Sequence, residues 1–83
     1  MMASPIISVL HALNNEALLN AANLSKILHV LRQTNFDATS ATEVADHLRQ
    51  NIRRDTAILK ATGGSPLQPT VYSVEQIREI AER

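Results

Sequence analysis

The residues best suited to binding chemistry form a basic cluster on one predicted helix: Arg49, Arg53, Arg54 and Lys60. Asp55 is the acidic residue among them, so positive charge is in local surplus. Arginine and lysine contact nucleic-acid phosphates, and arginine also reads guanine edges. The same cluster is typical of a solvated helix surface or of one that faces a protein partner. We favour a solvated or partner-facing surface over nucleic-acid binding, because Asp46 stands at pairing distance from Arg49 and reduces the surplus of positive charge.

The residue types needed for catalysis or metal binding do not occur at suitable spacings. The chain has no cysteine and no G-x-S-x-G motif. Glu43 and His47 are one helical turn apart and make half of a metal site, but no second pair at ligand spacing accompanies them. The run Gly-Gly-Ser-Pro at 63–66 is too short for a phosphate-binding loop. We therefore expect no enzymatic activity, no bound metal and no cofactor.

Length and charge narrow the class of protein. At 83 residues the chain is expected to form one domain, residues 1–83. Its formal net charge is zero, so the chain lacks the overall basicity typical of a nucleic-acid binder. No apolar run approaches the roughly 18 residues that would span a membrane, and no basic region precedes the first apolar stretch. We expect a cytoplasmic protein without a membrane segment.

The basic cluster lies in the clearest helical stretch, residues 41–62. Ser40 and Glu43 have the spacing of a capping box at its start. Gly63-Gly64, followed by Pro66, predicts its end. Apolar and small residues recur between these signals at steps of three and four, which is one face of a helix: Val44, Leu48, Ile52, Thr56 and Leu59.

Part of this stretch resembles the first half of a helix-turn-helix motif. The positions where that family has small or apolar residues are occupied by Ala45, Leu48, Ile52 and Ile58. The resemblance implies a turn at Gln50-Asn51 and a DNA-binding regulator. The apolar face, however, runs through 50–51 without a change of phase, as expected of one unbroken helix. We favour the unbroken helix and keep the motif as the alternative.

Other helices are predicted on both sides of this stretch. Ser4-Pro5 suits the start of a first helix, and Asn14-Asn15 is expected to break it. The pattern resumes at Ala17 and continues to residue 34. The short loop that follows, with Phe36 turned inward, predicts a helical hairpin of 17–34 and 41–62.

The end of the chain combines an extended segment with a last helix. The stretch SPLQPTVYS at 65–73 has two prolines and predicts extended backbone with at most one short strand. Ser73 and Gln76 then form a capping-box pair before a helix that ends at Arg83. Its expected inner face is Val74, Ile77, Ile80 and Ala81. The predicted fold is all-α, a small bundle of four or five helices with an extended segment before the last one.

The aliphatic residues of the first two helical stretches suggest the function. They exceed what one short partner helix can cover, so they form either an ordinary intramolecular core or an interaction face shared with another chain. The residues of the candidate interaction face are Ile6, Val9, Leu10, Leu13 and Leu18. The preferred hypothesis is a non-catalytic protein–protein interaction or assembly module that binds a protein partner or itself as a homo-oligomer. The alternative is a small helix-turn-helix DNA-binding transcriptional regulator that uses the four basic residues of the cluster.

Overall fold

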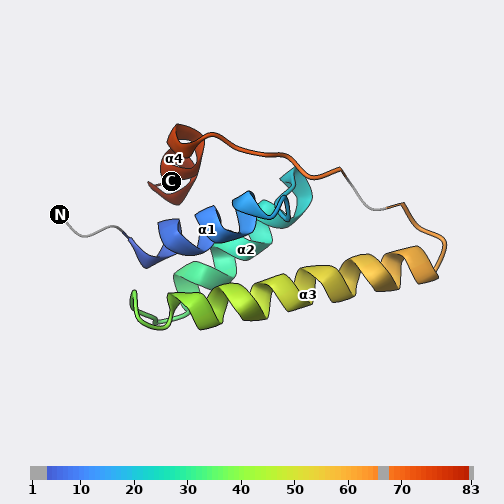
Figure 1. The fold of residues 1–83 in the computed structure, drawn as a ribbon, viewed down its shortest axis with the longest axis horizontal. Coiled ribbons are helices and arrows are strands. Elements are labelled where there is room, and N and C mark those ends of the chain that lie inside the picture. The colour runs from blue at the N-terminus through green and yellow to red at the C-terminus, as the bar shows by residue number, and fades with distance from the viewer. Residues whose placement is uncertain (1–3, 66–67, 83) are drawn as a thin grey trace.

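The computed structural model describes residues 4–65 and 68–82, which form four α-helices and no strand. The helices are α1 (Pro5–Asn15), α2 (Ala21–Gln33), α3 (Ala41–Ala61) and α4 (Val74–Glu82). The predicted all-α class, with a non-helical segment before the last helix, is confirmed. The 17–34 and 41–62 pair, predicted as a helical hairpin, is not the centre of the bundle, because α1 packs against the three other helices. In Figure 1 it lies between α3 and α4.

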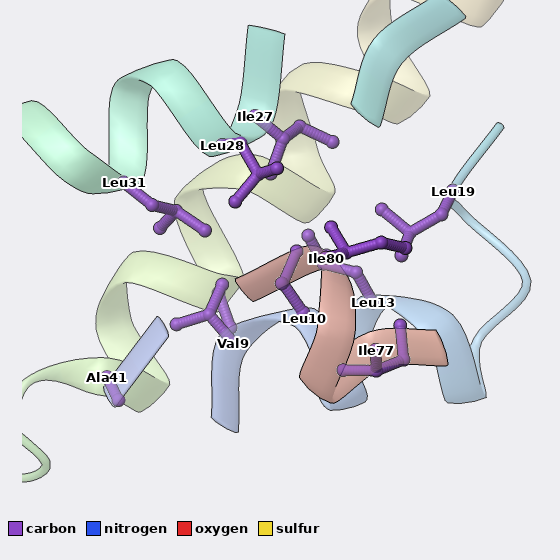
Figure 2. Close-up of a cluster of buried hydrophobic side chains, with 11 residues drawn as sticks. Val9, Leu10, Leu13, Leu19, Ile27, Leu28, Leu31, Ala41, Ile77 and Ile80 are labelled. Atoms are coloured by element: carbon purple, nitrogen blue, oxygen red, sulfur yellow. The ribbon is translucent and has the colours of Figure 1, made fainter. Parts of the chain in front are cut away.

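The core gathers around α1 because each of the other helices turns small or aliphatic side chains toward it (Figure 2). Its buried members are Val9, Leu10, Leu13, Leu19, Ile27, Leu28, Leu31, Ala41, Ala45, Ile77 and Ile80. Burial of each large aliphatic side chain contributes about 1.5–3 kcal/mol. The buried members of α3 are both alanines, Ala41 and Ala45, so this helix approaches α1 closely near its amino end.

The connection from α1 to α2 is longer than predicted. α1 ends at Asn15, as the two asparagines indicate, but α2 begins at Ala21 rather than Ala17. Asn20 sets this start, because its side chain accepts the N–H groups of Ala22 and Asn23 at 2.9 and 2.8 Å. The Asn23 side chain accepts the Asn20 N–H in return at 2.9 Å. Ala17, in between, has a left-handed φ of 56°.

The start of α3 is also capped differently from the prediction. The Ser40–Glu43 capping box is wrong, since Ser40 has a helical φ of −91° and ψ of −2° and makes no side-chain cap bond to α3. Asp37 and Ser40 form the reciprocal pair instead. The Asp37 carboxylate accepts the Ser40 N–H at 3.0 Å, and the Ser40 hydroxyl accepts the Asp37 N–H at 3.2 Å. These bonds hold Ser40 in a turn, where its hydroxyl cannot act as an extended N-cap.

α3 continues through residues 50 and 51, so the turn required by the helix-turn-helix interpretation is absent. The unbroken helix is confirmed, in line with an apolar face that keeps its phase. Its end is the predicted glycine stop. Gly63, with a φ of 85°, donates to the Lys60 carbonyl at 3.1 Å, and Gly64 donates to the Leu59 carbonyl at 2.8 Å. This is the Schellman pattern. The predicted roles of Pro66 and Arg83 lie outside the described residues.

α4 begins as predicted. The Ser73 hydroxyl accepts the Gln76 N–H at 3.1 Å, and the Gln76 side chain accepts the Ser73 N–H at 2.8 Å. Ile77 and Ile80 are buried, whereas Val74, predicted to face inward, is 61 % exposed. Val74 lies at the first position of the helix, where the chain has only just reached the core.

Candidate protein-binding face

The residues of the predicted basic cluster lie on α3, but Arg49 is engaged within the chain. Its Nε donates to the Glu16 carboxylate at 2.5 Å, and its guanidinium also pairs with Asp46. The hydrogen bond to Glu16 is the main cause that raises the pKa of Arg49. Glu16 directly follows the carboxyl end of α1, whose partial negative charge disfavours an acid. Arg49 therefore ties the α1–α2 connection to α3 and is not offered to an outside anion.

The three other basic residues differ in their surroundings. Arg53 lies one turn after Arg49, and its Nη2 is 3.6 Å from Glu16. Lys60 lies two turns further on the same flank and makes no ion pair among the described residues. Arg54 points about 100° further around the helix and donates to the Asn51 side chain at 2.7 Å. The cluster is therefore divided between two sides of α3.

The interaction face predicted on the first two helical stretches lies largely inside the molecule. Val9, Leu10 and Leu13 are at most 1 % exposed and form the centre of the core. Ile6 and Leu18 are half-buried and pack against it. Only these two residues of the predicted face offer surface to a partner while the chain stays folded.

An apolar stripe on α3 is covered by the chain along only part of its length. Ala41 and Ala45, at the amino end, are buried. Ile52 and Thr56, further along the same face, are half-buried, and Leu59 is 39 % exposed. α1 has 11 residues and α3 has 21, so α1 cannot follow α3 to its end. In Figure 1 the carboxyl end of α3 runs past the ends of α1 and α2.

A groove borders this uncovered stripe, which consists of Ile52, Thr56 and Leu59. One part of the groove, about 350 Å³, lies between α3 and the α1–α2 connection and includes Leu18 and Pro69 in its walls. Two further parts, about 360 and 170 Å³, lie between α3 and α2. Ile52 lines all three parts, so they adjoin along one side of α3.

The rim of the groove carries more positive than negative charge. Lys26 of α2 lines two of its parts, and Arg53 and Lys60 line the third. The acidic residue in its lining is Asp55. The amino end of α2, capped by Asn20, also reaches the groove and adds the positive end of its helix dipole. The groove thus combines an apolar floor with a positive rim.

The sequence patterns do not predict this groove or the polar residues at the amino end of α2 that line it, Asn20, Asn23 and Lys26. One signal was present in the chain. The apolar face from Val44 to Leu59 spans about four helical turns, whereas the first aliphatic stripe, from Ile6 to Leu13, spans about two. When a long apolar helix face packs against a short one, the end of the long face stays uncovered.

Within 4–65 and 68–82, no three histidine, aspartate or glutamate side chains lie close enough to hold a metal ion. Over the same residues no helix has the length and apolar character needed to cross a membrane. No family model, curated protein or solved structure matches this chain. The groove and the uncovered stripe are therefore the features that bear on function.

Proposed function

We propose that this chain is a non-catalytic interaction module that binds a protein partner through the groove beside α3. The observation that supports the proposal most is the apolar stripe Ile52, Thr56 and Leu59, which leaves the core and continues onto an uncovered helix face. Concave apolar surfaces that stay exposed on a small domain are typical of interaction sites. The core residues of α1 are already buried within the chain, so the exposed stripe of α3 is the better surface for a partner.

Self-association is the second part of the sequence-based hypothesis. The sequence predicts it from the aliphatic residues of the first two helical stretches, and three of these, Val9, Leu10 and Leu13, are buried in the core. That predicted surface is therefore largely closed to a second copy while the chain stays folded. The helix-turn-helix alternative lacks its turn in α3, so no observation favours it over the interaction module.

A titration with a neutral probe tests the proposed function. The probe is a synthetic amphipathic helix of about 18 residues, about five turns, with leucine on one face and glutamine beside it. Backbone amide NMR shifts should change for residues that line the groove and stay constant on α4. The Leu59→Gln variant should lose these changes.

Ile58→Gln provides the matched control. Ile58 is adjacent in α3 and 55 % exposed, but it does not line the groove. A probe that binds both variants equally, or that shifts no groove residue in the wild-type chain, contradicts the proposed function.

A further inference from the structure

The groove beside α3 has features that select the chemistry of its occupant. We infer that the groove binds an amphipathic helix of another protein, and that the apolar face of this helix is flanked by aspartate or glutamate. This inference rests on the function proposed above. Three observations carry this inference: the form of the walls, the charge of the rim, and the arrangement of charges that opposes a second copy.

The walls of the groove favour a helical occupant. In the two parts of the groove between α2 and α3, the lining residues belong to these two helices and to the N-cap Asn20, and the helical backbone N–H and C=O groups are used within each helix. An extended peptide would therefore find no strand edge to pair with there, and its own backbone groups would lose water without gaining partners. A helix satisfies its backbone internally and buries only side chains. From Leu48 to Lys60 the α3 wall is about 18 Å long, which matches about 12 helical residues.

The rim of the groove favours acidic flanks on that helix. Lys26 and Lys60 make no ion pair within the part of the chain that the structure describes. The side chain of Arg53 is 62 % exposed, although its Nη2 lies 3.6 Å from the Glu16 carboxylate. Asp55 opposes these three cations with a single negative charge. Carboxylates on both sides of an apolar helix face would meet cations from α2 and from α3.

The charges of α3 oppose a second copy of the chain as the occupant. If two α3 stripes paired in antiparallel fashion, each basic flank would face the same flank of its partner and bring Arg53 near Lys60 of the other copy. These like charges would repel each other. The acidic helix of the chain itself, α4, has Ile77 and Ile80 buried in its own core at 0 and 4 % exposure. It cannot present an apolar face to another copy while it remains folded.

Three synthetic peptides test the inference: the neutral probe already described, a twin with glutamate in place of the flanking glutamines, and a twin with lysine there. Their helicities are matched by circular dichroism, and their affinities are measured by fluorescence anisotropy. We expect the acidic twin to bind about tenfold more tightly than the basic twin, because several exposed ion pairs each add a small gain. This preference should shrink at about 0.5 M salt, where charges are screened within a few Å.

Charge reversals on the rim identify the groove as the cause. Lys26→Glu and Lys60→Glu should each weaken the acidic twin and strengthen the basic one. Arg78→Glu is the matched control, since it changes the net charge equally, and Arg78 is exposed on α4 and lines no part of the groove. It should change neither affinity by more than the general effect of net charge.

The outcomes separate the inference from the proposed function. If the neutral probe binds in the groove and the acidic twin binds no more tightly than the basic twin, the inference fails and the proposed function stands. If none of the three peptides binds, both fail. A concentration-dependent dimer in sedimentation that Leu59→Gln abolishes and Ile58→Gln preserves would make a second copy the occupant. Anionic lipid vesicles that displace the acidic twin would overturn the inference in favour of a membrane surface.

Discussion

The side chain of Asn14 makes two hydrogen bonds with the backbone of Tyr72, 58 positions later in the chain. Its amide nitrogen donates to the Tyr72 carbonyl, and its amide oxygen accepts the Tyr72 N–H, both at 2.8 Å. Asn14 thus pairs with both backbone groups of Tyr72, much as a neighbouring strand would. The Thr70 N–H donates to the Leu19 carbonyl at 2.8 Å and fixes the same segment at a second point. Together these bonds position α4 against α1.

We expect Asn14→Leu to lower the free energy of unfolding by about 1–3 kcal/mol, because two backbone groups of Tyr72 lose their partners. Asn14 is 5 % exposed, so water cannot readily replace the amide. Asn15→Leu is the control, since Asn15 is exposed at the end of α1. Urea denaturation measures both variants, and hydrogen exchange at the Tyr72 amide should accelerate only in the first. Equal stability of the two variants would show that the Asn14 pair contributes nothing.

The two asparagines show how far local reasoning extends. A pair at 14–15 correctly predicts the end of α1, because asparagine competes with helical hydrogen bonding in either position. Which of the two is buried depends on a residue at the other end of the chain, and no local spacing contains that information. The groove was missed for a similar reason. It arises from the relative lengths and directions of α1, α2 and α3, while each helix was predicted from its own periodicity.

The caps show a second limit, which is competition between overlapping patterns. Asp37 and Ser40 have the same spacing as Ser40 and Glu43, and a single serine cannot serve both pairs. The structure uses the earlier pair. Ser73 also has a candidate three positions earlier, Thr70, but the Thr70 N–H donates to the Leu19 carbonyl, and the predicted Ser73–Gln76 capping box is found. Spacing alone therefore does not decide which of two overlapping pairs forms.

The cap at Asp37 predicts a pH dependence of stability. The Ser40 backbone N–H, followed by the Ser40 hydroxyl, lowers the pKa of Asp37 from its ordinary value of 3.8. A carboxyl group whose pKa is lower in the folded state stabilises the fold above the unfolded pKa. This contribution is lost as the pH falls from about 3.8 through the lower folded pKa.

Asp37→Asn isolates this contribution, because asparagine keeps the acceptor oxygen but does not ionise. We expect the wild-type chain to exceed the variant in stability near neutral pH, and the difference to shrink as the pH falls below 3.8. Thermal unfolding followed by circular dichroism at a series of pH values measures it. A difference that stays constant across the acid range would contradict the assignment.

The continuity of α3 predicts the effect of glycine at its centre. Asn51→Gly should lower the free energy of unfolding by several tenths of a kcal/mol, because glycine is the poorer helix former and the bond from Arg54 is lost. Gly63→Ala should also destabilise the chain, since the φ of 85° at Gly63 is unfavourable for alanine. Denaturant unfolding measures both. Stabilisation by Asn51→Gly would indicate a left-handed turn at residue 51 instead of a helix.

The last prediction concerns duplex DNA, the partner that the basic cluster on α3 also suggests. Arg49 is held by Glu16 and Asp46, and Arg54 points to another side of the helix than Arg53 and Lys60. Two exposed cations on one flank of a chain without net charge attract phosphates weakly. We therefore expect binding no tighter than about 10⁻⁴–10⁻⁶ M at physiological salt, without dependence on base sequence.

A fluorescence titration of labelled duplexes at several salt concentrations measures this affinity. Because few phosphates can be neutralised, the log–log salt slope should be about −2 or shallower, at about −0.9 for each phosphate. Arg53→Ala should flatten the slope by at most about one unit. Arg54→Ala, on the other side of α3, serves as the matched comparison. Nanomolar, sequence-dependent binding that Arg53→Ala abolishes would replace the interaction module by a DNA-binding regulator, because only contacts with base edges produce such dependence on sequence.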